Sequence, residues 1–374
     1  MMQKEKKRRK ILRTGLCVIL ALLLLAAVGA GVLFREELGI IGTIRKESDE
    51  FPLYYMEVKG DYHFEEFLES GGAASDKEVE AFLTKCISKG FYQIEIEEVG
   101  PACSMISAED ENGGHVWGRN FDWNGSVPII VKCIPEDGYA SIATCDFKNI
   151  TGSMETRPDN FINKMLAIAA LYVPMDGVNE AGLCVADLEV NEGGMETIDT
   201  DKTDLTITNA TRLILNKAAT VEEAIEILEQ YDIYASGGIS HHLAVSDASG
   251  KSVVLEFVNG RMLPVESPCV TNFNLAGKDS SSGGESSQRR YESLCSAYDA
   301  NNGVLTWQQV KEELIKVSQP EGEWTTQWSM AYSGESGKVS YWFHCDYDRK
   351  WEYFRRMTLT FYLYPCIPSI FPLL

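Results

Sequence analysis

A cysteine, an arginine and an aspartate stand at spacings that a β-hairpin would bring together. The residues from Cys103 onward read as a strand, an acidic and glycine-rich turn follows over 109–114, and a second strand leads to Arg119 and Asp122. Because the strands of a hairpin pair along their length, the end of the second strand returns to the start of the first. A thiol, a guanidinium and a carboxylate are therefore predicted to share one pocket.

This combination suits nucleophilic attack on an amide, which requires a nucleophile, a base and donors for the oxyanion. The thiol of Cys103 would attack, and Arg119 would lower the thiol pKa from its usual value of about 8.5. An α-amine, with an ordinary pKa of about 7.7–8.0, could accept the proton. That amine exists only if the chain is cut between Ala102 and Cys103, and Asp122 would then orient it. The competing interpretation is an ordinary surface pair of Arg119 and Asp122, which would contribute little.

Four further motifs follow this hairpin in a fixed order, and the resemblance that they carry covers roughly 91–345. After the Cys and the G-R-N-F-D-W at 118–123 come D-G-V-N-E-A-G-L at 176–183, HLAVSDASGKSVVLEFV at 242–258, V-T-N at 270–272 and S-S-Q-R-R-Y at 286–291. In this order they resemble the choloylglycine hydrolase family, which includes conjugated bile acid hydrolases and penicillin V acylases. The long segment before Cys103 is more similar to the related branch of acid ceramidase and N-acylethanolamine acid amidase.

The resemblance implies an α+β fold, the four-layer αββα sandwich of N-terminal-nucleophile (Ntn) hydrolases. It implies Cys103 as the nucleophile, freed by self-cleavage, and the side-chain amide of Asn272, together with Asn179, as the oxyanion hole. It also implies Arg290 as a second arginine of the pocket; Arg289 stands beside it, and the choice rests on the family's order of Arg and aromatic residue. Asn272 would equally suit a turn.

The expected activity is hydrolysis of a linear N-acyl amide of the bile salt, penicillin V or fatty-acyl type. Two alternatives stay open: a non-enzymatic surface-binding protein on the same fold, and an acyltransferase that uses the same cysteine. The five histidines form no H-E-x-x-H and the ten cysteines form no C-x-x-C, so neither a metal nor another cofactor is predicted. The expected partners are the small-molecule amide and a membrane, and self-assembly is left open.

The N-terminus predicts export. Residues 1–14 are basic, and residues 15–34 are twenty residues without a charge, enough at about 1.5 Å per residue to cross a bilayer core of roughly 30 Å. The basic flank should remain in the cytoplasm, so that the rest of the chain lies outside. The apolar helix is either a transmembrane anchor or a cleaved signal with a small-residue site at 28–30. The protein is then held at the cell membrane with an extracytoplasmic body, or is secreted.

The remaining chain divides into a pre-segment, a catalytic domain and a tail. The boundaries are 35–102, which would be a propeptide or a small subunit, 103–355 and 356–374. In the pre-segment, Ser75 and Glu78 predict a capped helix, and 91–98 alternates as a strand. Asn259-Gly260 predicts a hairpin, whereas the tail is apolar, contains prolines and has no assignment. The net charge of -21 argues against a nucleic-acid binder, because an acidic body repels phosphate.

Overall fold

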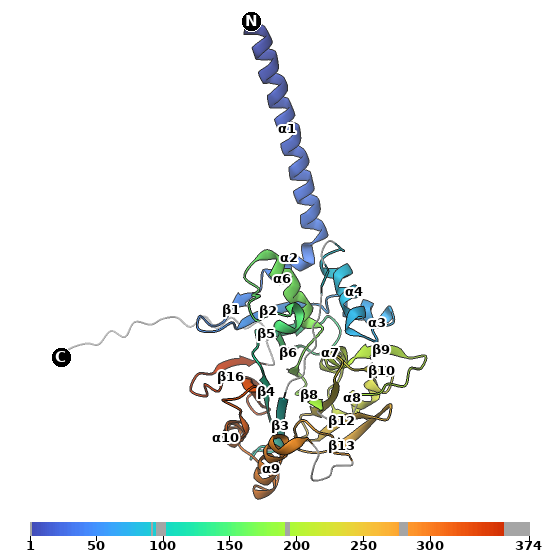
Figure 1. The fold of residues 1–374 in the computed structure, drawn as a ribbon, viewed down its shortest axis with the longest axis vertical. Helices are drawn as coiled ribbons and strands as arrows, with labels where there is room; N and C mark the ends of the chain where they lie inside the picture. The colour runs from blue at the N-terminus through green and yellow to red at the C-terminus, as the bar shows by residue number, and fades with distance from the viewer. Residues whose placement is uncertain (1, 91–92, 95–101, 191–194, 277–282, 355–374) are drawn as a thin grey trace, which may run out of the picture.

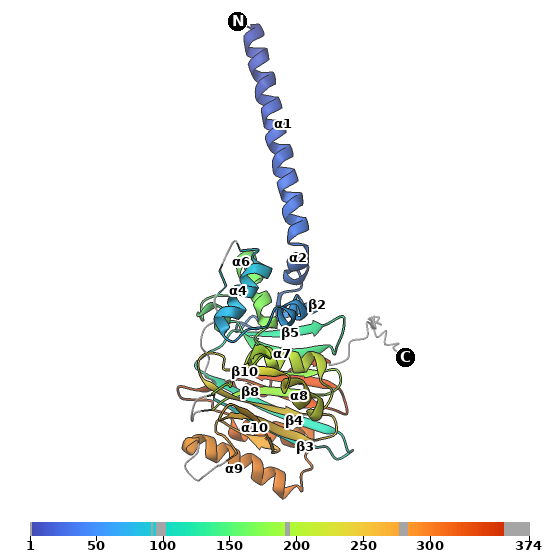
Figure 2. The same cartoon turned by 90° about the vertical axis from the view of Figure 1, so that its right-hand side faces the viewer.

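The computed structural model describes residues 2–90, 93–94, 102–190, 195–276 and 283–354. Its first element is the helix α1, Met2–Leu33, which stands away from the body in both views (Figures 1 and 2). The stretch Leu12–Leu33 is 22 residues long, and its most apolar window is not buried in the protein. Its length and composition suit both a membrane-spanning helix and a signal sequence, the two alternatives that the sequence leaves open.

The body is built on two β-sheets. Within the described residues, the larger sheet has nine strands in the order β1-β2-β5-β6-β7-β8-β11-β12-β13, antiparallel except for the parallel pair β2 and β5. These strands are β1 Arg45–Lys46, β2 Tyr54–Lys59, β5 Pro128–Ile134, β6 Ser141–Asp146, β7 Asp176–Asn179, β8 Cys184–Val190, β11 Ser240–Ser246, β12 Ser252–Val258 and β13 Arg261–Glu266. The turn between β12 and β13 is the predicted one, with Asn259 and Gly260 both at positive φ.

The second sheet carries the predicted hairpin. In the described part of the chain it has six strands, in the order β14-β3-β4-β15-β16-β17. They are β3 Ala102–Glu109, β4 His115–Trp123, β14 Cys269–Val270, β15 Thr325–Ser333, β16 Lys338–Phe343 and β17 Trp351–Phe354. In the β3–β4 register Cys103 lies opposite Phe121 and Ala102 opposite Asp122. The hairpin therefore returns to the start of β3, as the sequence predicts.

Three apolar clusters define four layers. One lies between the two sheets and includes Met105, Phe121 and Val178. A second covers the outer face of the larger sheet, and a third covers the outer face of the smaller sheet. The αββα sandwich is thereby confirmed. The helices over the larger sheet are α2 Arg35–Ile41, α3 Phe64–Glu69, α4 Asp76–Ile87, α5 Lys148–Thr151, α6 Phe161–Ala167, α7 Ile207–Lys217 and α8 Val221–Leu228; those over the smaller sheet are α9 Gly284–Ala300 and α10 Trp307–Val317.

Both faces of strand β4 are buried, and the charged residues of its motif lie on opposite faces. Alternate residues of a strand point to opposite faces. Trp117 and Phe121 enter the cluster between the sheets, whereas Val116 enters the cluster under α10. Gly118 lets α10 approach closely, because a Cβ there would lie 2.7 Å from a side-chain carbon of Val310. Arg119 therefore faces the space between the sheets, and Asp122 faces the side of α9 and α10.

The pre-segment belongs to the same folded body. β2 pairs with β5, which follows the β3–β4 hairpin in the chain, and its Tyr54 and Met56 are buried in the cluster under the helices. The sequence did not predict this strand. Ser75 does precede α4, but its side chain makes no capping hydrogen bond. The strand predicted over 91–98 lies mostly outside the described residues, and the two described residues there form no strand. The tail also lies outside the described residues.

Candidate active site

Cys103 is the second residue of β3, and its side chain is fully buried. Arg119 stands opposite Met105, one diagonal step from Cys103 on the same face of the hairpin. Its Nη2 donates to Cys103 Sγ at 2.9 Å, and its Nη1 donates to the carbonyl of Met175 at 2.6 Å. Nη1 also forms an ion pair with Asp176 at 3.1 Å. The predicted contact between thiol and guanidinium is present, and it is entirely removed from solvent.

Asp122 lies on the other face of β4 and is held by several donors. Its carboxylate accepts hydrogen bonds from Thr326 Oγ1 at 2.6 Å and from Gln319 Nε2 at 2.8 Å. Arg290 Nη1 approaches the same carboxylate at 3.5 Å. Burial raises the pKa of Asp122, while Arg290 and the two hydrogen bonds oppose that rise. Because the backbone of Ala102 lies opposite Asp122, the carboxylate is next to the peptide that would have to be cut.

Asn272 and Arg290 hold the backbone of Cys103. The N–H of Cys103 donates to Asn272 Oδ1 at 2.8 Å. Arg290 Nη1 donates to the carbonyl of Cys103 at 2.6 Å, and its Nη2 donates to Asn272 Oδ1 at 3.0 Å. Asn272 Nδ2 donates to the carbonyl of Glu189, at the end of β8, at 3.0 Å. Five of the six residues predicted from the sequence, Cys103, Arg119, Asp122, Asn272 and Arg290, are thus joined in one network.

The side chain of Asn179 lies outside this network, and its part in an oxyanion hole stays a prediction. Asp176 and Val178 of β7 point between the sheets, so that Asn179 points to the opposite face, under α7. Its Nδ2 donates to the carbonyls of Leu215 and Ala218, and its Oδ1 accepts from the backbone N–H groups at 181 and 183. These four bonds use the full capacity of the amide. Asn179 closes a turn and anchors the end of α7.

The thiol of Cys103 is mostly protonated in the uncut chain. Burial raises its pKa to about 12, although Arg119 opposes this shift. The nucleophile is the thiolate, and a thiol with so high a pKa is almost entirely protonated near neutral pH. Attack on a substrate amide therefore requires an activating base, and the α-amine that cleavage would create is such a base.

Three residues of the network were not singled out from the sequence. Asp176 lies in a motif that was recognised, but the functional residue was sought at Asn179 instead. Gln319 and Thr326 come from the loop and the strand after α10, and no local pattern marks them. Asp176 contacts Arg119, whereas Gln319 and Thr326 contact Asp122; the contacts of Asp176 and Thr326 are buried, and that of Gln319 is partly buried. The register of β7 against β6 and of β15 against β4 places Asp176 and Thr326 near the site.

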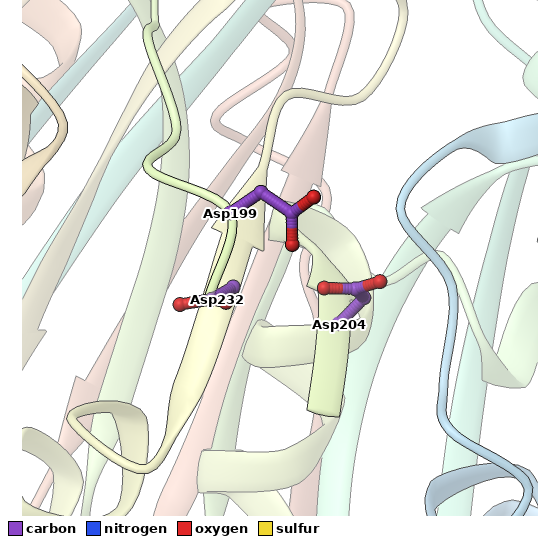
Figure 3. A group of neighbouring side chains, drawn as sticks. All are labelled: Asp199, Asp204 and Asp232. Atoms are coloured by element: carbon purple, nitrogen blue, oxygen red, sulfur yellow. The ribbon is translucent and has the colours of Figure 1, made fainter. Parts of the chain in front are cut away.

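A group of three carboxylates lies apart from this network. Asp199, Asp204 and Asp232 have oxygen atoms within 4.8 Å of one another, beside the small parallel sheet of β9, Thr203–Thr206, and β10, Tyr231–Tyr234 (Figure 3). The carboxylate of Asp232 already accepts two hydrogen bonds from Thr200, at 2.6 and 2.8 Å. Acidic groups of this kind are common without an ion, and we assign no role to this one.

The sequence from Cys103 onward matches a known family. Residues 103–266 match the profile described as linear amide C-N hydrolases, choloylglycine hydrolase family. Over this stretch the chain is similar to the choloylglycine hydrolase family. The match begins at Cys103, the residue on which the network converges. No curated protein is similar enough in sequence to match the chain.

Solved structures of choloylglycine hydrolases and their relatives align with most of the body. Penicillin V acylase from Agrobacterium tumefaciens is 18% identical with a TM-score of 0.45, and the alignment covers 64% of this chain and 83% of that one. Two single-residue variants of conjugated bile acid hydrolase from Clostridium perfringens are 17% and 18% identical. Both have a TM-score of 0.48, with 67% of this chain and 92% of the other covered.

Proposed function

We propose that the protein is an exported linear-amide C–N hydrolase whose nucleophile is the thiol of Cys103, made N-terminal by self-cleavage. The observation that carries the proposal is that three groups of Cys103 are held at once. Arg119 contacts its Sγ, Asn272 its backbone N–H and Arg290 its carbonyl. A structural cysteine needs none of these contacts, whereas a nucleophile whose own amine acts as the base needs its main chain and its side chain fixed together.

Self-cleavage would begin with attack of Cys103 Sγ on the carbonyl carbon of Ala102. The C–N bond breaks as the C–S bond forms, and the thiol proton passes to the departing nitrogen, which becomes the α-amine of Cys103. Water then hydrolyses the thioester, giving a carboxylate at Ala102 and restoring the thiol. Asp122 is positioned to stabilise the new ammonium group, because it lies opposite Ala102 in the hairpin.

In the processed enzyme the same thiol would attack the substrate amide. The α-amine accepts the thiol proton and later donates it to the leaving amine. The tetrahedral intermediate carries a negative oxygen, which the side-chain amide of Asn272 would stabilise by a hydrogen bond. Arg119 stabilises the thiolate, and Asp122 and Arg290 hold the amine and Asn272 in place. Water completes the cycle by hydrolysing the acyl-enzyme.

The family supports substrates with a bulky apolar acyl part and a small polar leaving group. The chain after residue 14 holds 27 basic and 54 acidic side chains, so that the approach of strongly anionic leaving groups from bulk solvent is disfavoured. Taurine and glycine conjugates carry such a charge. We therefore place bile salts level with penicillin V and N-acyl amides of fatty acids as candidate substrates.

The test combines an N-terminal determination with a substrate panel. Intact mass spectrometry of the purified protein should find a chain that begins at Cys103. That processed protein should release the amine from at least one of glyco- and tauro-conjugated bile acids, penicillin V and fatty N-acyl amides, with Cys103→Ala as the blank. A fully active uncut chain would refute the mechanism. Inactivity on the whole panel, with Cys103 N-terminal, would favour acyl transfer or a binding protein.

We also propose that α1 anchors the protein and that the pre-segment remains bound after cleavage. The parallel pairing of β2 with β5 and the burial of Tyr54, Met56 and Val58 do not depend on the peptide bond before Cys103. The catalytic chain should thus sediment with membranes through a high-salt wash and co-elute with the pre-segment in detergent. Concentrated guanidinium chloride should separate the two chains, whereas uncut Cys103→Ala should stay single. A catalytic chain that washes off in native buffer would contradict the retention.

A further inference from the structure

Asp176 is the charged residue of the D-G-V-N motif that faces the nucleophile. Its carboxylate and the guanidinium of Arg119 are both fully buried and lie 3.1 Å apart. Arg119 uses its other terminal nitrogen for Cys103 Sγ. The guanidinium therefore stands between an acid and a thiol, and it is the group through which Asp176 acts on the thiol.

The position of Asp176 is fixed by aromatic packing. Trp328 Nε1 donates to Asp176 Oδ2 at 2.8 Å. The Trp328 ring stacks on Phe121 with centroids 3.8 Å apart and planes within 6°, and Arg119 Cζ lies 5.2 Å from the centroid of the same Phe121 ring. Trp328 thus contacts Asp176 and Phe121, and Phe121 in turn contacts Arg119. These contacts between the sheets fix the Asp176 carboxylate beside the guanidinium.

We propose that Asp176 is a positioning residue for amide hydrolysis, the counter-charge that limits how strongly Arg119 attracts the Cys103 thiolate. The proposal rests on the proposed function of Cys103. A thiolate that is stabilised too strongly is a weaker nucleophile, because nucleophilicity falls as the thiol pKa falls. Asp176 would thus preserve the nucleophilicity of the thiolate, at the cost of a smaller thiolate population.

The charges around the site support this role. The charged groups that act on Cys103 or Arg119 come from β4, β7, β8 and α9, and they are Arg119, Asp122, Asp176, Asp187 and Arg290. Asp187 is paired with His241 at 2.8 Å. The two arginines are then balanced by Asp122 and Asp176. Transfer of the thiol proton to the α-amine creates one negative and one positive charge, so the balance persists through the reaction.

The test replaces the charge and keeps the shape. In Asp176→Asn an amide oxygen can still accept from Arg119 and Trp328, while the negative charge is lost. Alkylation of Cys103 by iodoacetamide is followed against pH, with peptide mass spectrometry to resolve it from the other cysteines. The pH midpoint of alkylation should fall by about one unit. One pKa unit corresponds to a modest change in the interaction energy between two charges at the effective dielectric of a protein. The acid limb of kcat/KM should move with it, and the plateau should fall about threefold.

Two variants separate this effect from general damage. Asp176→Glu restores the charge and should return the midpoint towards that of the wild type. Asp146→Asn removes another fully buried carboxylate of the same sheet, which accepts from the backbone at 127 and 148, and should leave the midpoint unchanged. A folded Asp176→Asn protein with an unchanged or raised midpoint would overturn the proposal. Alkylation does not require an amide substrate. A wild-type protein that is inactive on the substrate panel would therefore contradict the proposed function, and the alkylation test of Asp176 could still be carried out.

Discussion

Replacing Cys103 by alanine is expected to leave the chain uncut and to reduce amide hydrolysis by about 10⁶-fold, to the limit of detection. The variant removes only Sγ. The backbone N–H and carbonyl of residue 103 keep their bonds to Asn272 and Arg290, so the fold should persist. Gel electrophoresis and intact mass would report the cleavage, and release of the amine from the best substrate of the panel would report hydrolysis.

Cys184→Ala is the matched control. Cys184 is fully buried in the same cluster between the sheets, on β8. It should be cut normally and retain most of its hydrolysis, while losing a similar amount of buried sulfur. If Cys103→Ala were cut at the same bond, or if both variants lost activity equally, Cys103 would not be the nucleophile and the site would have to be placed elsewhere.

The hairpin around Cys103 is local, and local patterns were sufficient to predict it. An acidic glycine-rich turn between two apolar runs fixes the register within a few residues, and the register places Arg119 beside the thiol. The same holds for Asn259-Gly260, which joins β12 to β13. In each case the interacting residues lie close together in the chain.

The face of a short strand was harder to predict. β7 has four residues, and its motif offers both Asp176 and Asn179 as polar candidates. Choosing between them requires knowing which of the two side chains points toward the smaller sheet. This depends on how β7 pairs with β6 and β8. The resemblance favoured Asn179, whereas strand alternation places Asp176 in the site. A one-residue shift of register would have reversed the answer.

Contacts between distant segments escaped the sequence analysis altogether. β2 is separated from its parallel partner β5 by the whole hairpin, and Thr326 reaches Asp122 from the far end of the domain. Helix α9, Gly284–Ala300, is polar and buries Arg290, Ser287 and Leu294 along one side. Its apolar face is too narrow to give a helical signal in the sequence.

Replacing Asn272 by alanine should lower kcat for amide hydrolysis by about 100- to 1000-fold, the usual cost of removing one donor from an oxyanion hole. KM should change little, because the donor acts on the charge that develops in the transition state. Self-cleavage should slow as well, since Asn272 Oδ1 accepts the N–H of Cys103 and a bond from Arg290. Steady-state kinetics on the processed protein would measure the first effect, and the time course of processing the second.

Two comparisons distinguish an oxyanion donor from a structural residue. Asn209→Ala removes another fully buried asparagine, whose Nδ2 donates to the carbonyl of Tyr172 at 2.9 Å and whose Oδ1 accepts from Thr206 at 2.8 Å; it should destabilise the fold but retain kcat. Asn272→Asp keeps the acceptor oxygen and loses the donor. If Asn272 only orients Cys103, the aspartate variant should hydrolyse far better than the alanine variant. Equal loss of kcat in both, with KM preserved, is the result that the oxyanion role requires.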